Sequence, residues 1–396
     1  MANRTFPTIA FVLPWYSQDI VGGAEIETRK LAENLQLRGL SVEILATCAK
    51  DGSSGWTKDY FKEEKSVEGD LTIRRFRLDR RPLTHFDQLN ARLMRGEGIT
   101  PEQETLFMSE SVSSRRLCSF IENNIQSYVF VFIPYLFGTT YWGSKAAAGR
   151  SFLIPCLHDE GYARMRLIQE MFRGFNKVLF HTVPELNLAR RLYGVPDDQI
   201  FLLGEGVDTD VTGNANAFAK AYGICDPFVL YVGRRDEGKN TPLLIDYFCR
   251  FKRRNECDLK LVLAGVGQVA VPEPFKGDVI DLGFLPEQKK HDAYAAALVT
   301  CQPSVNESFS IVIMESWVQG TPVLVHGKCD VTKDHCLRSN GGLYFTDYWE
   351  FEGCLQYFLK NREMGRRMGE LGSRYVKANS SWERITKRFV SAVFGD

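Results

Sequence analysis

The chain has 396 residues, more than a single domain usually contains, so two domains are predicted. Its composition is globular, with 44% hydrophobic and 25% charged residues. The formal net charge is zero, which removes the global electrostatic argument for a nucleic-acid-binding protein.

Features that bear on the compartment point to the cytoplasm. No apolar run approaches the roughly 18 residues of a membrane-spanning helix. The first seven residues lack the apolar region of a signal peptide. Ten scattered cysteines are typical of reduced thiols. We expect a cytoplasmic protein, with a peripheral contact to anionic lipid at the inner membrane face as an open alternative. Five arginines carry that alternative, although such a run is more often a solvated edge: Arg74, Arg75, Arg77, Arg80 and Arg81.

Apolar and amphipathic segments alternate along the first half of the chain. Helical patterns occupy residues 25–36 and 106–123, and repeated β-α units predict a parallel sheet covered on both faces. Residues 79–104 are charged, contain two prolines and lack a clear strand, so we expect an insertion there. The strand patterns are at residues 8–13, 42–46, 129–134, 152–157 and 177–181.

Two short motifs follow strands of this first half. Gly22 and Gly23 stand between the first strand and the first helix, where glycine lets a ligand approach the backbone. Simple turn geometry is the alternative. His158 follows the strand pattern at 152–157, where an imidazole can hydrogen-bond sugar hydroxyls. A lone histidine is more often structural.

A second series of strands begins after residue 227. Residues 204–227 are rich in Gly, Asn, Asp and Ala and weakly periodic, which predicts a linker. Two doubly wound sheets predict a cleft between their carboxyl edges. We expect an N-terminal domain over 1–203 and a C-terminal domain over 204–379. The new strand patterns are at residues 228–232, 260–264, 279–282, 298–302 and 322–326.

Two cations follow the first strand of the second series. Arg234 and Lys239 are five residues apart and come directly after residues 228–232. A planar guanidinium and a compact ammonium at a strand end can hold a diphosphate together. A solvated charged loop is the alternative interpretation.

The most informative segment is 299–325, which predicts strand, loop, helix and strand. Glu307 lies in the loop and Glu315 follows on the helix. Eight residues at about 100° each turn through about 800°, so Glu315 can border the N-terminal end of the helix. Helix N-termini bind phosphate through free N–H groups. One carboxylate beside a phosphate site and one slightly deeper suit a sugar nucleotide.

This segment resembles the Glu-x7-Glu motif of family 4 retaining glycosyltransferases, which have the GT-B fold. The resemblance implies that Glu307 faces the donor sugar and Glu315 binds the ribose hydroxyls. The common Glu-Gly-Phe-Gly is Glu-Ser-Phe-Ser here. Backbone N–H groups at Ser310, Ile311 and Val312 can still contact the donor, because every residue except proline supplies one.

The resemblance also gives roles to the other motifs. It implies that Arg234 and Lys239 bind the donor phosphates and neutralise the leaving group. It implies that Gly23 meets the donor phosphate and the acceptor, and that His158 faces the donor sugar. In GT-B proteins the final helix crosses back, so residues 380–396 are expected to pack on the N-terminal domain.

We therefore expect a retaining, metal-independent glycosyltransferase. It would move a sugar from a nucleotide-diphospho-sugar to a hydroxyl of a sugar, a lipid-linked or another acceptor, in polysaccharide, glycolipid or other glycoconjugate biosynthesis. We expect no cofactor and no metal. Two alternatives stay open. One is a sugar-nucleotide epimerase or phosphorylase on the same fold, and the other is a non-catalytic sugar-nucleotide-binding protein.

Three patterns are set aside. Asp208 and Asp210 form the Asp-x-Asp signature of the other large glycosyltransferase fold, but they lie in the predicted linker. Residues 265–270 mimic a dinucleotide fingerprint, but prolines follow where a helix would have to begin, so a turn is predicted. Four clustered residues match no common zinc spacing: His326, Cys329, His335 and Cys336.

Overall fold

The computed structural model describes residues 6–19, 22–82, 84–147 and 149–395. Contacts divide the chain into two compact units. Unit 1 comprises residues 1–206 with 382–396, and unit 2 comprises residues 207–381. The sequence-based boundaries were 203/204 and 379/380. Residues 1–5, which contributed to the expectation that no signal peptide is present, lie outside the described residues.

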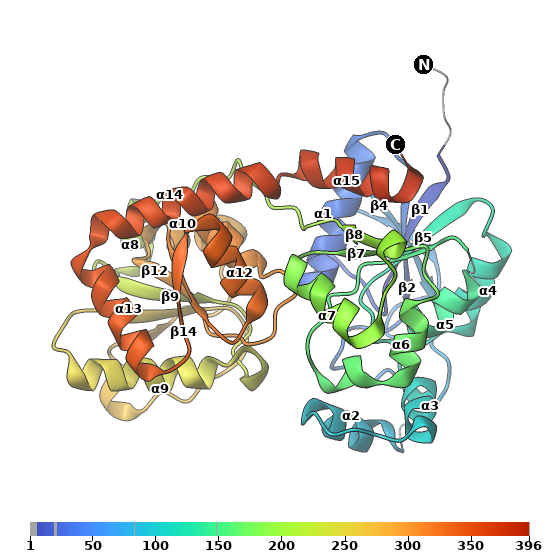
Figure 1. The fold of residues 1–396 in the computed structure, drawn as a ribbon, viewed down its shortest axis with the longest axis horizontal. Helices are drawn as coiled ribbons and strands as arrows, with labels where there is room; N and C mark the ends of the chain where they lie inside the picture. The colour runs from blue at the N-terminus through green and yellow to red at the C-terminus, as the bar shows by residue number, and fades with distance from the viewer. Residues whose placement is uncertain (1–5, 20–21, 83, 148, 396) are drawn as a thin grey trace. The chain divides into compact units, whose positions relative to one another are not determined.

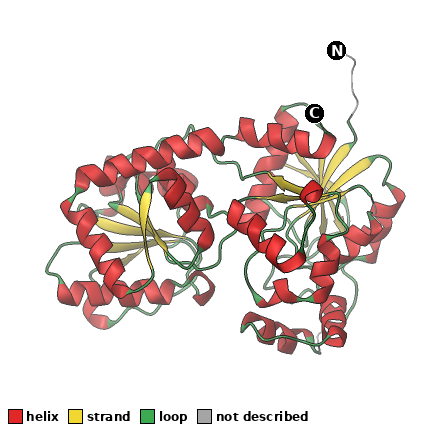
Figure 2. Ribbon diagram, viewed as in Figure 1, coloured by secondary structure: helices red, strands yellow, loops and turns green. Residues whose placement is uncertain are grey.

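Unit 1 is built on an eight-stranded sheet with helices on both sides (Figures 1 and 2). The strand order is β3-β4-β2-β1-β5-β6-β7-β8, and the only antiparallel pair among the described strands is β3 with β4. The strands are β1 (Thr8–Val12), β2 (Val42–Thr47), β3 (Lys65–Glu68), β4 (Leu71–Phe76), β5 (Tyr128–Phe132), β6 (Ser151–Leu153), β7 (Lys177–Phe180) and β8 (Ile200–Leu202). The helices are α1 (Gly23–Leu37), α2 (Phe86–Met94), α3 (Pro101–Glu110), α4 (Arg115–Asn123), α5 (Gly138–Ala146), α6 (Arg166–Phe172), α7 (Val183–Tyr193) and α15 (Trp382–Phe394).

Alternation along the strands of unit 1 supplies two apolar layers. On β1, Val12 packs in the layer on one face and Phe11 in the layer on the other, as the two-residue period of a strand requires. The C-terminal helix α15 contributes Ile385 and Phe389 to the second layer. The rings of Phe11 and Phe389 lie 5.8 Å apart, so the last helix is part of the core of unit 1.

Two expectations for unit 1 are wrong in detail. The single helix predicted over 106–123 is two helices. The helix α3 ends at Glu110, and α4 begins after Ser114, which caps it by accepting a hydrogen bond from the Leu117 N–H at 3.3 Å. The charged insertion at 79–104 contains α2 and the start of α3. Thr100 and Gln103 form a capping box there, a helix signal that the high charge obscured.

The arginine run considered for lipid contact does not form one exposed surface. The Arg75 side chain is buried, pairs with Glu68 at 2.5 Å and donates to the Tyr16 carbonyl. Arg74 contacts Glu43. Burial lowers the pKa of Arg81 to about 10.

Unit 2 contains a six-stranded, all-parallel sheet with the order β11-β10-β9-β12-β13-β14. Counted from its own first strand, this is 3-2-1-4-5-6, the order of a doubly wound nucleotide-binding sheet. The strands are β9 (Phe228–Val232), β10 (Lys260–Ala264), β11 (Val279–Asp281), β12 (Val299–Gln302), β13 (Val323–His326) and β14 (Gly342–Phe345). The helices are α8 (Ala215–Tyr222), α9 (Thr241–Arg254), α10 (Glu287–Ala296), α11 (Ile311–Val318), α12 (Asp330–Ser339), α13 (Tyr348–Lys360) and α14 (Arg362–Asn379).

The segment predicted to be a linker, 204–227, contains helix α8, so that prediction is wrong for its second half. Asn214 caps α8 by accepting from the Ala217 N–H at 3.0 Å, and Gly223 ends it at φ 68°. Phe218 is buried and stacks on Phe228 with ring centroids 5.4 Å apart. The Asn and Gly that suggested a linker are the two caps of a short helix.

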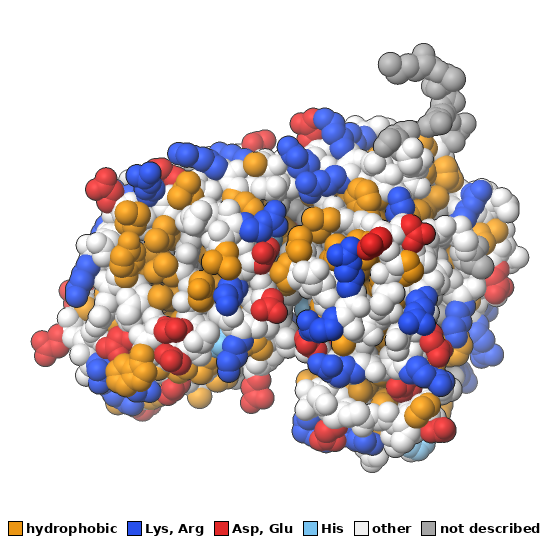
Figure 3. Space-filling model, viewed as in Figure 1, with side chains coloured by type: hydrophobic (Ala, Val, Ile, Leu, Met, Phe, Trp, Pro, Cys, Tyr) orange, Lys and Arg blue, Asp and Glu red, His pale blue; other side chains and the backbone are white. Residues whose placement is uncertain are grey.

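The distribution of surface charge agrees with the net charge of zero, and the state of the cysteines agrees with their scattered positions in the sequence. Positive and negative side chains are interspersed on the face shown in Figure 3. All ten cysteines are free thiols. Among the described residues, no helix combines the length and the apolarity needed to cross a membrane.

Candidate functional site

A lysine and a glutamate meet where the strand order of unit 2 reverses, at the carboxyl ends of β9 and β12. Lys239 follows β9 and Glu307 follows β12; Lys239 Nζ lies 2.7 Å from Glu307 Oε1. The Lys239 side chain is 27% exposed and the Glu307 side chain 10% exposed, so solvent can reach the pair. Ligands of doubly wound sheets bind in the crevice at this reversal. The structure thus brings together two predicted site residues.

Local turns fix the position of Lys239. The Asp236 carboxylate accepts from the Lys239 N–H at 2.8 Å, which closes a short 3-10 turn over Glu237–Lys239. Asn240 then adopts a left-handed conformation at φ 56° and donates from its side chain to the Pro303 carbonyl at 3.0 Å. This bond joins the loop after β9 to the loop after β12.

Two adjacent arginines at the end of β9 have opposite environments. The Arg234 side chain is 64% exposed, and its nearest carboxylate is Asp236 at 3.5 Å, a weak surface pair. The Arg235 side chain is 5% exposed, forms an ion pair with Asp281 and donates to the Gly265 carbonyl at 2.8 Å. Arg234 can therefore turn to a ligand, whereas Arg235 supports the loops.

The second predicted glutamate has two partners that the sequence analysis missed. Glu315 on α11 is buried; its Oε1 lies 2.7 Å from Lys290 Nζ and its Oε2 accepts from the Tyr294 hydroxyl at 3.0 Å. Lys290 and Tyr294 are four residues apart on α10, so they lie on one helix face. Burial by itself would lower the pKa of Lys290, but the carboxylates of Glu315 and Glu287 outweigh it and raise that pKa. The i, i+4 spacing was the available sequence signal.

The residue before helix α11 has a conformation that favours glycine. Ser310 lies at φ 73° and ψ 70°, in the left-handed region, and is buried. Ile311 and Val312 open the helix, whose first N–H groups have no intrahelical acceptor. Ser310 stands where the common form of the motif has glycine, and in this backbone conformation serine is strained by roughly 1 kcal/mol.

The glycine pattern at 265–270, predicted to be a turn, is an irregular loop in which Gly267 pairs with Arg235 in an isolated β-bridge. A side-chain carbon on Gly265 would lie 2.0 Å from the Gly233 carbonyl, so glycine allows two loops to pack closely there. The next short helix begins only at Glu273. Among the described residues, no helix that could bind a diphosphate begins directly after β10.

In unit 1, the two glycines before α1 differ in their surroundings. A side-chain carbon on Gly22 would lie 2.0 Å from a Glu25 oxygen, whereas one on Gly23 would meet nothing within 4 Å. A side chain at Gly22 would have to displace the Glu25 carboxylate, whereas the backbone of Gly23 is open to approach. The His158 ring is 29% exposed; its Nδ1 lies 3.8 Å from Glu160, which accepts from the Tyr135 hydroxyl at 2.8 Å.

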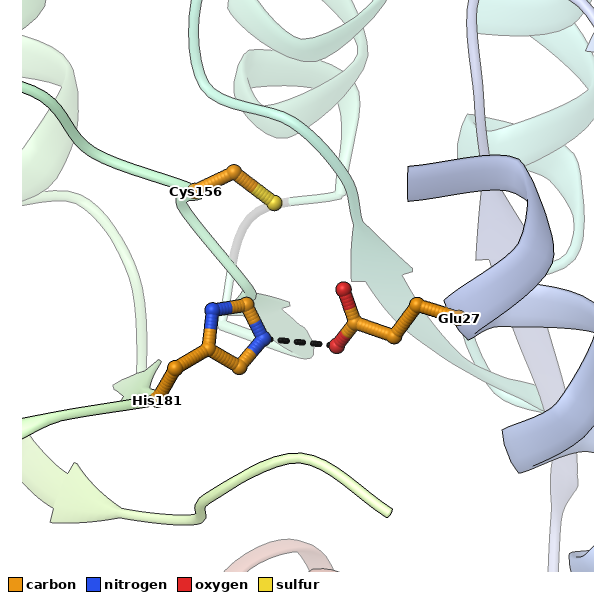
Figure 4. Close-up of side chains that lie close together, drawn as sticks. All are labelled: Glu27, Cys156 and His181. Atoms are coloured by element: carbon orange, nitrogen blue, oxygen red, sulfur yellow. Dashed lines mark hydrogen bonds and ion pairs between the residues drawn. The ribbon is translucent and has the colours of Figure 1, made fainter. Parts of the chain in front are cut away.

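A group of three side chains in unit 1 points toward a common centre (Figure 4): Glu27, Cys156 and His181. They are the one group of metal-ligand type found in the part of the chain that the structure describes. Their geometry is that of an ion pair, because His181 Nε2 and Glu27 Oε1 are 2.6 Å apart. Two ligands of one tetrahedral Zn²⁺, at about 2.0 Å each, would be roughly 3.3 Å apart.

The clustered His and Cys residues of unit 2 do not converge on a metal either. His335 Nδ1 lies 2.9 Å from the Tyr375 hydroxyl, and burial lowers the pKa of His335 to about 3. His326 Nδ1 accepts from the Lys328 N–H at 3.2 Å. Both rings have structural hydrogen-bond partners.

Residues 218–374 match the family model of glycosyl transferases group 1. The match contains all the predicted site residues of unit 2. D-inositol 3-phosphate glycosyltransferase of Kribbella flavida is 29% identical over 41% of this chain and 43% of its own length. The chain thus spans less than half the length of this curated relative in their alignment. Phosphatidyl-myo-inositol mannosyltransferase of Mycobacterium leprae is 25% identical over 80% of this chain and 77% of its own.

Solved structures resemble the whole chain. Sucrose-phosphate synthase of Thermosynechococcus elongatus superimposes with a TM-score of 0.73 at 17% identity, covering 97% of both chains. Anabaena HepE in complex with UDP and glucose gives 0.71 at 13% identity, covering 99% and 100%. WaaG, a glycosyltransferase involved in lipopolysaccharide biosynthesis, gives 0.67 at 13% identity, covering 98% and 100%. The predicted GT-B fold, with two parallel-sheet α/β domains, is confirmed.

Proposed function

We propose that the protein is a retaining glycosyltransferase of the family 4 type, which transfers a sugar from a nucleotide-diphospho-sugar to an acceptor hydroxyl. The observation that carries the proposal is the Lys239–Glu307 pair at the strand-order reversal of unit 2. This pair lies within the region that matches group 1 glycosyltransferases. It puts an ammonium and a carboxylate where the diphosphate and the sugar of a donor would meet.

Each residue has a part in the proposed chemistry. Lys239, Arg234 and the first N–H groups of α11 stabilise the negative charge that develops on the leaving diphosphate. Glu315, held by Lys290 and Tyr294, accepts from the ribose hydroxyls. Glu307 faces the sugar, where positive character develops at the anomeric carbon.

We propose front-face attack for the transfer. The bond between the anomeric carbon and the phosphate oxygen breaks as the acceptor oxygen bonds to the same face of that carbon. The acceptor proton passes to the leaving phosphate. In unit 1, the open backbone at Gly23 and the exposed ring of His158 are proposed to contact donor phosphate and sugar.

Donor identity is tested by thermal-shift titration with nucleoside diphosphates and their sugars. Uridine diphosphate sugars come first in the panel, because HepE structures contain UDP and UDP-glucose. Release of nucleoside diphosphate is then measured with and without acceptors, including inositol phosphates and phosphatidylinositol. We expect release that depends on an acceptor. Donor conversion without any acceptor would favour an epimerase, and binding without turnover would favour a non-catalytic binding protein.

Metal independence is a second part of the proposal. Two cationic side chains and a helix N-terminus provide the charge that a divalent cation supplies to the diphosphate in other enzymes. Saturating chelator is expected to leave transfer largely intact. Loss of activity that manganese or magnesium restores would contradict this and would return Asp208 and Asp210 as ligand candidates.

We also propose a cytoplasmic location, where the ten thiols stay reduced. A lipid-linked acceptor would require a peripheral contact with the membrane, for which exposed Arg77 is a better candidate than buried Arg75. Co-sedimentation with anionic and with zwitterionic vesicles tests this contact. Equal binding to both, or to neither, would count against it.

A further inference from the structure

A buried hydrogen-bond network in unit 1 joins the first turns of α1 to the end of β7 and to the loop that contains His158. Its members are Glu27 on α1, His181 directly after β7, and Glu185 in the first turn of α7. All three side chains are at most 6% exposed. Burial of ionisable groups costs free energy unless each group is paired. The pairing contacts of these three side chains therefore show how the network is stabilised.

Glu185 holds two segments with one carboxylate, the loop after β6 and the residue directly after β7. Its Oε1 accepts from the Leu157 N–H at 2.7 Å, and its Oε2 accepts from the His181 N–H at 2.7 Å. Its own N–H donates to Thr182, which caps α7. Leu157 directly precedes His158. The Glu185 carboxylate therefore fixes the backbone from which the His158 ring extends.

The His181 side chain carries the connection to α1. Its Nε2 contacts Glu27 Oε1 at 2.6 Å (Figure 4). Glu27 follows Gly23 by one helical turn, so its position sets that of the first turn of α1. A continuous series of hydrogen bonds thus runs from the Gly23 end of α1, through His181 and Glu185, to the peptide before His158.

The charges around His181 favour its protonated form. Burial alone would lower the pKa of His181, but the carboxylates of Glu27, Glu185 and Glu205 raise it to about 10. Cys156 also faces the ring, and burial together with the same carboxylates keeps its thiol pKa well above the usual value. A charged imidazole between two carboxylates binds both more strongly than a neutral ring would.

We propose that Glu27, His181 and Glu185 are positioning residues, which hold Gly23 and His158 in the arrangement that sugar transfer requires. The inference rests on the proposed glycosyl transfer. None of the three needs to touch substrate. Their effect on the reaction is geometric, since displacement of reacting groups by about 1 Å can cost on the order of 100-fold in rate.

The decisive variant is Glu27→Gln, which keeps size and one acceptor but removes the charge beside His181. We expect kcat to fall about 10- to 100-fold, with donor KM changed less than threefold. In this variant the pKa of His181 should fall, so kcat should decrease further as pH rises from 6 to 9. The wild-type protein should show no such added decrease. Glu27→Asp, which retains the charge, should recover part of kcat.

A matched control separates positioning from general loss of stability. Glu352 in unit 2 is also buried and accepts from Arg254 and Asn255, but it contacts no candidate site residue. Glu352→Gln should lower the unfolding temperature and leave kcat and its pH profile unchanged.

The outcomes are distinct. Wild-type transfer with kcat of Glu27→Gln within twofold of wild type overturns the inference and leaves the proposed function standing. A loss of kcat that is the same at every pH, and that Glu352→Gln shares, also overturns it. A wild-type protein that transfers no sugar with any donor and acceptor overturns the proposed function and the inference together.

Discussion

The two units hold the carboxylates at their candidate site edges in different ways. In unit 2, Glu307 pairs with Lys239, and both side chains are partly reachable from solvent. In unit 1, Glu27 and Glu185 surround His181 with almost no exposure. Both edges are formed by parallel strands. The ion pair of unit 2 is partly exposed, so a ligand can reach it, whereas the ion pair of unit 1 is surrounded by protein alone.

The difference separates two uses of charge. A partly exposed pair can exchange partners with a diphosphate, because water already solvates part of each group. A buried pair cannot be broken without leaving a charge unsatisfied, so it fixes geometry instead. We therefore expect variants of the unit 2 pairs to change binding and catalysis directly, and variants of the unit 1 network to act through position and stability.

The largest effect is expected for the cations of unit 2. Arg234→Ala or Lys239→Ala removes charge that we propose stabilises the leaving diphosphate, and should raise the barrier for kcat/KM by about 2–4 kcal/mol. Affinity for nucleoside diphosphate, measured by calorimetry, should fall too. Lys276→Ala is the control, since Lys276 forms an exposed pair with Glu273 away from the predicted site residues. Wild-type kinetics in either test variant would contradict the proposed role.

A smaller effect should distinguish the two glutamates. Glu307→Gln should chiefly lower kcat, because positive character at the anomeric carbon develops in the transition state. Glu315→Gln should chiefly raise donor KM, because contacts with the ribose hardly change during the reaction. Each effect is expected at roughly 1–3 kcal/mol.

Steady-state kinetics with a confirmed donor and acceptor measure both variants. The structure adds a stability difference: Glu315→Gln leaves the mostly buried Lys290 without its nearest charge, so its unfolding temperature should fall more than that of Glu307→Gln. The reverse kinetic pattern would reject the assignment of the two roles.

The buried network of unit 1 predicts a pH-dependent stability. The pKa of His181 is raised in the folded protein, to about 10. Its contribution to stability is therefore complete below its unfolded pKa of about 6.5 and is lost as pH rises through the folded value. The difference in unfolding free energy between wild type and His181→Asn should shrink by roughly 1 kcal/mol per pH unit between pH 7 and 10. Urea unfolding at three pH values measures it, and a constant difference would contradict a charged His181.

The smallest effect concerns the residue before α11. Ser310→Gly should relieve left-handed strain and raise the unfolding free energy by about 1 kcal/mol. Ser308→Gly is a matched control of the same chemical change, two residues away, where the backbone is not left-handed. It should be neutral or destabilising, because glycine adds entropy to the unfolded chain. Equal shifts in thermal unfolding for both variants would refute the strain argument.

Much of the fold and part of the site could be predicted from the sequence. Strand periodicity located the central strands, and the pattern around Glu307 and Glu315 predicted the strand, loop and helix that the structure has as β12 and α11. Lys239 and Glu307 are 68 residues apart in sequence and were predicted separately as site residues; both follow strands that flank the reversal of strand order, and the structure pairs them there.

The remaining features depend on tertiary contacts. Nothing local distinguishes Arg234 from Arg235, because the partners of Arg235 come from elsewhere in the sheet: Asp281 ends β11 and Gly265 directly follows β10. Lys290 becomes a partner of Glu315 only when α10 packs beside α11. The helix α8 was missed because Asn and Gly serve both as linker residues and as helix caps.

The placement of α15 in the core of unit 1 has a consequence for synthesis. Unit 2 is one uninterrupted stretch, whereas the second apolar layer of unit 1 includes Ile385 and Phe389 from the far end of the chain. On the ribosome, the first two hundred residues emerge without the helix that covers Phe11, and unit 2 can complete its core earlier. A chain that is interrupted before Trp382 would hold a finished C-terminal unit and an unfinished N-terminal one. Quality-control proteases would then find exposed apolar surface at the beginning of the protein.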